Sequence, residues 1–201
     1  MNQSIKELIL EFEEIGMLNF GEFTFKSGIQ SPIYTNMRIL ISYPKLMKKV
    51  AKVYSELLKN LKYDRLGGIP YAGLPLTAAI SLEREEPWVF YRKETKAYGL
   101  GNIVEGEFKK GERVVIIDDL VSKGDSKFDA VAPFEAAGFE ISDFVVLMNY
   151  GFGADEVLKA SGYSLHYAFT MHDVVSVLLE EKRINQSTFD KVEKFISENQ
   201  I

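Results

Sequence analysis

Two adjacent aspartates, Asp118 and Asp119, directly follow the apolar run Val114–Ile117. The run is rich in β-branched residues, which predicts a buried strand. A short polar loop containing Gly124 comes next, and a helical pattern begins at Ser126. A loop that enters a helix N-terminus offers free N–H groups and a positive dipole end, which suits a phosphate. Carboxylates beside it can accept hydrogen bonds from vicinal hydroxyls. The spacing therefore indicates a site for a phosphorylated sugar; the alternative is a buried strand that ends in a solvated turn.

A second segment could also take part in chemistry. It has three cations within five residues, Arg92, Lys93 and Lys96. It opens a polar, glycine-containing stretch over 92–110 without sustained periodicity, which predicts a long loop with room for a β-ribbon. Long loops in compact domains often act as lids. A basic lid suits a polyanion whose negative charge grows during a reaction, such as departing pyrophosphate. The alternative is a solvated charged loop.

The rest of the chain alternates strand and helix patterns, with no clear linker or internal repeat. The alternation predicts an α/β fold with a mostly parallel sheet and right-handed crossovers, in which ligands bind at the carboxyl ends of the strands. Ser4–Glu7 matches a capping box for the first helix. The expected strands are 20–25, 33–36, 66–69, 88–91, 113–118, 144–148 and 165–169. The expected helices are 4–15, 44–60, 74–83, 126–137, 154–161, 173–182 and 188–199.

Composition limits the remaining possibilities. The 201 residues are most simply one domain, 1–201, with a sizeable core. A formal net charge of -5 argues against a nucleic-acid partner. The absence of cysteine excludes disulfides and thiol catalysis, and two histidines are too few for a multi-histidine metal centre. No apolar run is long enough to span a membrane, and the N-terminus lacks a signal-peptide layout. We therefore expect a cytoplasmic protein that engages no membrane.

Four motifs together resemble those of the orotate phosphoribosyltransferases, which are type I phosphoribosyltransferases. Asp118–Ser126 resembles the motif that binds phosphoribosyl pyrophosphate (PRPP), and Arg92–Gly99 resembles the lid. Phe25–Tyr34 and Gly68–Pro75 resemble the N-terminal motif and the pyrophosphate-binding turn. The similarity extends from about Phe20 to Arg183. It implies a mostly parallel central sheet flanked by helices, with a small N-terminal hood and a flexible lid loop.

The resemblance also implies a reaction and its partners. The family transfers the 5-phosphoribosyl group from PRPP to orotate, giving orotidine 5′-monophosphate and pyrophosphate in pyrimidine biosynthesis. Magnesium takes part, bound mainly through PRPP and pyrophosphate and not by a dedicated protein site. The lid reaches the active site of the neighbouring subunit, which implies a homodimer.

Residue roles follow from the same resemblance. The catalytic residues would be Lys96, Asp118 and Asp119, with Lys96 stabilising or protonating the leaving pyrophosphate. Orotate would be bound by Lys26, Tyr34 and Tyr150. PRPP would be bound by Tyr71, Ala72, Arg92, Lys93, Lys96, Tyr98, Asp118, Asp119, Leu120, Val121, Ser122, Lys123, Gly124, Asp125 and Ser126.

Two departures from the family pattern leave alternatives open. The phosphate loop usually has Thr-Thr-Gly-Gly where this chain has Ser-Lys-Gly-Asp over 122–125, and Asp125 would tolerate a positive φ better than most residues. The family also has Asp-Arg where this chain has Asn149 and Tyr150, and that arginine binds orotate. Tyrosine supplies no charge. The alternatives are transfer to another base, such as uracil or a purine, or a non-catalytic regulator that senses PRPP. Association with a decarboxylase is left open.

Overall fold

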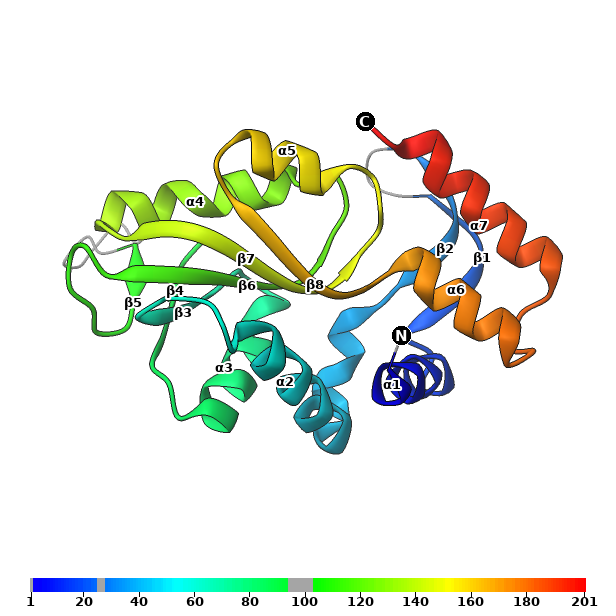
Figure 1. Cartoon of the computed structure of the whole chain (residues 1–201), viewed down its shortest axis with the longest axis horizontal. Coiled ribbons are helices and arrows are strands. Elements are labelled where there is room, and N and C mark those ends of the chain that lie inside the picture. Colours follow the sequence, from blue (N-terminus) through cyan, green and yellow to red (C-terminus); the bar gives the residue numbers. More distant parts are fainter. Residues whose placement is uncertain (1, 25–27, 94–102) are drawn as a thin grey trace.

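A six-stranded sheet forms the centre of the molecule (Figure 1). The structure is a computed structural model that describes residues 2–24, 28–93 and 103–201. The strand order is β5-β4-β3-β6-β7-β8, and all neighbouring pairs are parallel except β4 with β5. The predicted α/β fold with a mostly parallel sheet is thus confirmed. The strands are β3 (Arg65–Gly68), β4 (Trp88–Tyr91), β5 (Val104–Glu105), β6 (Arg113–Val121), β7 (Glu140–Asn149) and β8 (Ser164–Thr170).

The central strand β6 is buried on both faces, as its apolar run predicts. Val115 and Ile117 belong to the core on one face, where α2 and α3 pack. Val114 and Ile116 belong to the core on the other face, with Phe134 of α4. Figure 1 shows these two layers of helices on opposite sides of the sheet. The covering helices are α2 (Pro44–Leu58), α3 (Gly73–Arg84), α4 (Asp125–Ala137) and α5 (Ala154–Ala160).

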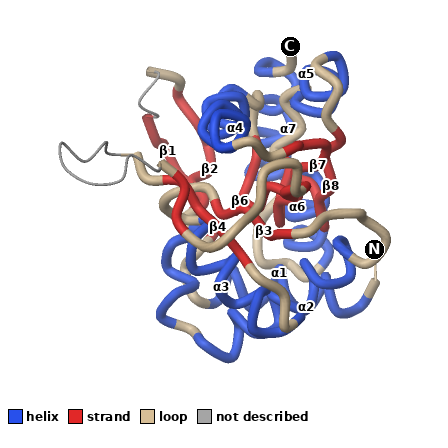
Figure 2. Tube along the Cα trace, turned by 90° about the vertical axis from the view of Figure 1, so that its left-hand side faces the viewer, coloured by secondary structure: helices blue, strands red, loops and turns tan. Residues whose placement is uncertain are grey.

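A separate antiparallel ribbon and both ends of the chain form the hood. The ribbon lies apart from the central sheet in Figure 1, and Figure 2 draws the strands of both sheets in red. Helix α7 packs on β2, and α1 packs on α6. A short 3₁₀ helix, which the sequence patterns did not predict, connects the hood to α2. The hood elements are α1 (Gln3–Glu14), β1 (Leu18–Thr24), β2 (Gln30–Thr35), η1 (Met37–Ser42), α6 (Met171–Glu180) and α7 (Gln186–Asn199).

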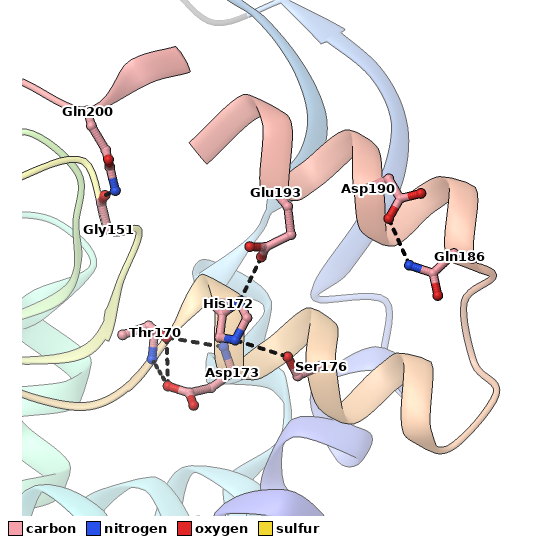
Figure 3. A network of polar contacts seen from close by, with 9 residues as sticks. All are labelled: Gly151, Thr170, His172, Asp173, Ser176, Gln186, Asp190, Glu193 and Gln200. Atoms are coloured by element: carbon pink, nitrogen blue, oxygen red, sulfur yellow. Dashed lines mark hydrogen bonds and ion pairs between the residues drawn. The ribbon is translucent and has the colours of Figure 1, made fainter. Parts of the chain in front are cut away.

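The helix caps correct one expectation. Helix α1 is capped by Asn2, whose Oδ1 accepts the Ile5 N–H at 2.9 Å, so the capping box predicted at Ser4 is wrong. The capping box that does form belongs to α6, between Thr170 and Asp173 (Figure 3). Within the described ranges, no helix is both long and apolar enough to cross a membrane.

Candidate active site

Strand β6 delivers the two aspartates to the edge of the sheet where the parallel strands end. Asp118 is buried, and each of its carboxylate oxygens already has a partner. Oδ1 accepts the Asp119 N–H at 3.0 Å, and Oδ2 accepts a hydrogen bond from Lys127 Nζ at 2.5 Å. The Asp118 carbonyl oxygen also accepts from the Tyr54 hydroxyl of α2 at 2.6 Å. Asp118 is therefore fixed from three directions.

Asp119 lies in different surroundings. Its Oδ1 accepts the Leu120 N–H at 2.8 Å. Burial, followed by the negative charge of Asp118, raises the pKa of Asp119 to about 7, although Lys127 acts in the opposite direction. A carboxyl group with such a pKa changes its charge near neutral pH. Perturbed groups of this kind are frequent at functional sites.

A cavity of about 400 Å³ brings segments distant in sequence around these carboxylates. Its walls come from the hood, from the turn after β3 and from the end of β4. The predicted residues that meet here are Tyr34, Tyr71, Ala72, Lys93, Asp118, Asp119 and Leu120. Residues that sequence reasoning did not assign also line it, among them Thr35, Arg38, Tyr91 and Asp129.

The turn after β3 supplies the expected pyrophosphate-binding residues. The Pro70–Tyr71 peptide bond is cis, and the Gly73 N–H returns to the Ile69 carbonyl at 3.0 Å. Tyr71 is exposed, and Lys93 Nζ lies 5.1 Å from the centre of its ring. This is a cation–π distance, so the turn and the start of the predicted lid meet. Arg92 forms an ion pair with Glu105 of β5 at 3.0 Å.

The predicted phosphate loop lies between β6 and α4. Gly124 has a φ of 99°, and Asp125 is already the first residue of α4. Gly124 therefore takes the left-handed conformation that the sequence suggested for Asp125. Val121 packs with Val146 and Ala154 in the core, so only its backbone can face a ligand. The loop enters α4 with the polarity that favours an anion.

A second, smaller cavity adjoins the first on the side of the hood. Its volume is about 210 Å³, and it shares Tyr34, Thr35 and Leu120 with the larger cavity. Tyr150 is buried in its wall, with its hydroxyl 3.0 Å from Thr35 Oγ1. Burial raises the pKa of Tyr150 to about 12, so this residue stays uncharged. The other lining residues are Ser122 and Phe152.

Three predicted site residues, Lys26, Lys96 and Tyr98, lie outside the described residues. Lys127 is the most informative residue that the motifs missed, because it contacts Asp118 directly. A charged residue in the first turn of a helix that packs on the core was a usable signal. Among the described residues, no group of three or more His, Asp and Glu side chains is arranged to hold a metal ion.

Known proteins are similar to this chain in both fold and sequence. The bifunctional enzyme PyrF/PyrE of Nostoc sp. is 37% identical over 92% of this chain, which covers 39% of that protein. The solved UMP synthase of Leishmania donovani superposes with a TM-score of 0.91 at 38% identity, over 98% of this chain and 43% of that one. The chain thus spans about two fifths of these bifunctional relatives. No family model matches the sequence.

The fold and the carboxylate-containing cavity define a type I phosphoribosyltransferase. The orotate phosphoribosyltransferase of Listeria monocytogenes is 30% identical over 97% of this chain and 95% of its own length. This chain belongs to the orotate phosphoribosyltransferase family.

Proposed function

We propose that this chain transfers the 5-phosphoribosyl group of PRPP to orotate, giving orotidine 5′-monophosphate and pyrophosphate. The observation that carries the proposal is the cavity in which the β6 carboxylates meet the turn after β3 and the base of the lid. PRPP has a ribose diol, a pyrophosphate and a 5′-phosphate. We expect the carboxylates to meet the diol, the turn after β3 to meet the pyrophosphate, and the loop before α4 to meet the 5′-phosphate. The likeness to the Listeria enzyme over nearly its whole length supports the same conclusion.

In this proposal N1 of orotate attacks C1′ of the ribose as the bond from C1′ to the pyrophosphate oxygen breaks, and the N1 proton passes to the departing pyrophosphate. Positive charge develops on the ribose ring, and negative charge grows on the leaving pyrophosphate. Asp119 accepts hydrogen bonds from the ribose hydroxyls, and backbone N–H groups of the loop before α4 hold the 5′-phosphate. Lys93 and the turn at Tyr71 bind the pyrophosphate. Lys96 of the lid stabilises it as it leaves, which lowers the barrier through interactions made in the transition state.

Magnesium would enter together with PRPP. This ion keeps several waters and is commonly held by substrate phosphates with few protein ligands. The site fits that mode, because Asp118 already has a partner on each oxygen and the cavity is open to a polyphosphate. Bound magnesium supplies charge neutralisation on the leaving pyrophosphate.

We also propose that the active enzyme is a homodimer in which each lid completes the partner's site. The single chain leaves the apolar side chains of Ile41, Tyr43 and Leu82 exposed, and a subunit interface would cover side chains of this kind.

The direct test is orotate consumption with PRPP and magnesium, followed by chromatography for orotidine 5′-monophosphate and pyrophosphate. We expect both products in equal amounts. Asp119→Asn, folded as judged by circular dichroism, is the matched control and should be inactive. Folded wild-type protein that binds PRPP but consumes no base would point to the regulatory alternative.

A second acceptor deserves a place in the same assay because of Tyr150. The smaller cavity presents neutral hydroxyls where the family has an arginine, and this favours an uncharged base such as uracil. Orotate and uracil are compared side by side at saturating PRPP. A higher kcat/KM for uracil than for orotate would identify uracil as the acceptor base. The proposed transfer of the phosphoribosyl group would still stand.

A further inference from the structure

The buried amine of Lys127 is a feature that neither the motifs nor the proposed reaction explains. The side chain is only 1% exposed. Its Nζ donates to Asp118 Oδ2 at 2.5 Å and to the Leu120 carbonyl oxygen at 2.9 Å. Lys127 thus extends from the first turn of α4 back to the end of β6.

This position is unfavourable for a cation on general grounds. Removing an ammonium group from water is costly, and the positive end of the helix dipole opposes it. The hydrogen bonds from Lys127 Nζ to Asp118 and to the Leu120 carbonyl oxygen offset these costs. Its retention at this place indicates a role that an apolar residue of similar size would not fulfil.

The contacts of Lys127 connect the two sides of the predicted phosphate loop. One side is the end of β6, where Asp118 and Leu120 lie. The other is the start of α4, where the Lys127 N–H also donates to the Gly124 carbonyl at 2.8 Å. A single residue therefore closes the base of the loop before any ligand arrives. Such preorganisation lowers the cost of ordering a binding site.

The two aspartates also differ in their hydrogen-bond partners. Asp118 has one oxygen bound to Lys127 and the other to the Asp119 N–H. Asp119 uses only Oδ1, for the Leu120 N–H, and its Oδ2 accepts no hydrogen bond from the described residues. Within the described part of the chain, both carboxylates line the cavity, and only Asp119 has an oxygen without a hydrogen-bond partner.

We propose that Lys127 is a positioning residue for PRPP: paired with Asp118, it fixes the loop and the end of β6 in the arrangement that receives the ligand. The role rests on the proposed function in so far as PRPP is the ligand. It goes beyond it by adding Lys127, which lies outside the predicted PRPP-binding residues, as a support for them.

The test is a double-mutant cycle on PRPP affinity, measured by calorimetry with magnesium and no base, together with thermal unfolding. Lys127→Met and Asp118→Asn each leave one buried charge without its partner. We expect each to weaken PRPP binding by about ten-fold or more. Because the two residues act through one contact, the double variant Asp118→Asn/Lys127→Met should bind PRPP about as weakly as the weaker single variant, and not with the product of the two losses. Asp119→Asn should lose binding in either background.

Lys159→Met on α5 is the matched control, because Lys159 is exposed and lies outside the site. It should bind PRPP as wild type does. The assignment is overturned if Lys127→Met binds PRPP normally. It is also overturned if the losses of the two single variants multiply in the folded double variant, because Lys127 would then act independently of Asp118. A double variant that cannot fold would assign Lys127 to packing alone.

The design separates this proposal from the proposed function. A wild-type protein that binds no PRPP would refute the function, and the role of Lys127 with it. A wild-type protein that binds PRPP, with variants that do not differ from it, refutes only the role of Lys127.

Discussion

Asp119 has a carboxyl group whose surroundings oppose its charge. The charged and titratable groups around it come from several elements: Asp118 on β6, Lys127 on α4, Tyr54 on α2 and Tyr150 after β7. With its pKa at about 7, Asp119 is largely protonated at pH 6. Because the ionised form is the better acceptor for ribose hydroxyls, we expect kcat/KM for PRPP to rise with pH through about 7.

The measurement is kcat/KM for PRPP across the pH range, with Lys127→Met as the comparison. Removing the cation should move the rise to higher pH, because Lys127 lowers the pKa of Asp119. PRPP titrates equally in both experiments, so only the difference between the proteins is informative. Identical profiles would show that Asp119 does not control PRPP binding.

The same carboxyl group should affect stability with a definite sign. Its folded-state pKa of about 7 lies above the ordinary value of 3.8, so the folded protein holds this proton at pH values where the unfolded chain has lost it. The contribution of this proton to stability is therefore lost as pH rises from about 4 through about 7. Asp119→Asn removes the effect. We expect the Tm of Asp119→Asn minus the Tm of wild type, measured by calorimetry, to increase as pH rises across this interval. A difference that stays constant with pH would contradict the assignment.

Tyr150 allows a test of base recognition at the level of one side chain. Tyr150→Arg should lower the orotate KM by about ten-fold, because a charge-assisted contact to the orotate carboxylate contributes roughly 1.5 to 3 kcal/mol. Asn149 is best left unchanged, since its Nδ2 donates to Asp155 at 2.6 Å and an aspartate there would face that carboxylate. Steady-state kinetics with orotate and uracil provide the measurement. Tyr150→Phe is the control, and an unchanged orotate KM in Tyr150→Arg would place the carboxylate elsewhere.

At the scale of elements, α3 and β6 approach so closely that only glycine fits between them at Gly73. An added Cβ would lie 2.7 Å from the Ile117 carbonyl oxygen and 3.4 Å from Asp118 Oδ1. Gly73→Ala should therefore separate the two elements, lower the free energy of unfolding by about 1–3 kcal/mol and weaken PRPP binding. Urea unfolding and PRPP titration measure the two effects. Gly21→Ala, where the added atom has ordinary contacts with Phe23, should change neither.

The elements also show what the sequence could predict. The β-branched run at Val114–Ile117 and the pattern from Pro44 gave β6 and α2, because buried strands and amphipathic helices have distinct periods. The first helix was placed well, yet its cap is Asn2 and not Ser4, since both residue types can cap and only the geometry selects between them. The position of Lys127 in the first turn of α4 was a usable signal, but its contact with Asp118 could not be predicted, because only the fold brings the two residues together.

For the whole molecule, the hood is assembled from both ends of the chain and covers the edge where the parallel strands end. Figure 3 shows His172 of α6 facing Glu193 of α7, with 2.9 Å between Nδ1 and Oε1. Beyond α7, Gln200 Nε2 donates to the Gly151 carbonyl at 3.3 Å, next to Tyr150. The wall of the smaller cavity is therefore supported by the last helices and not only by the sheet. If the smaller cavity binds the base, as we propose, we expect substitutions in these helices to change base recognition.

The assembly of two chains gives the final prediction. If each lid serves the partner's site, Lys96→Ala damages the site of the neighbouring subunit, whereas Asp119→Ala damages the site of its own. Mixing the two inactive proteins and allowing subunits to exchange should then produce heterodimers with one intact site each. Random exchange makes about half of the dimers mixed, so about a quarter of the wild-type sites should be recovered. Activity is measured before and after exchange, with dimer formation followed by light scattering. Proven exchange without recovery would mean that Lys96 acts within its own subunit.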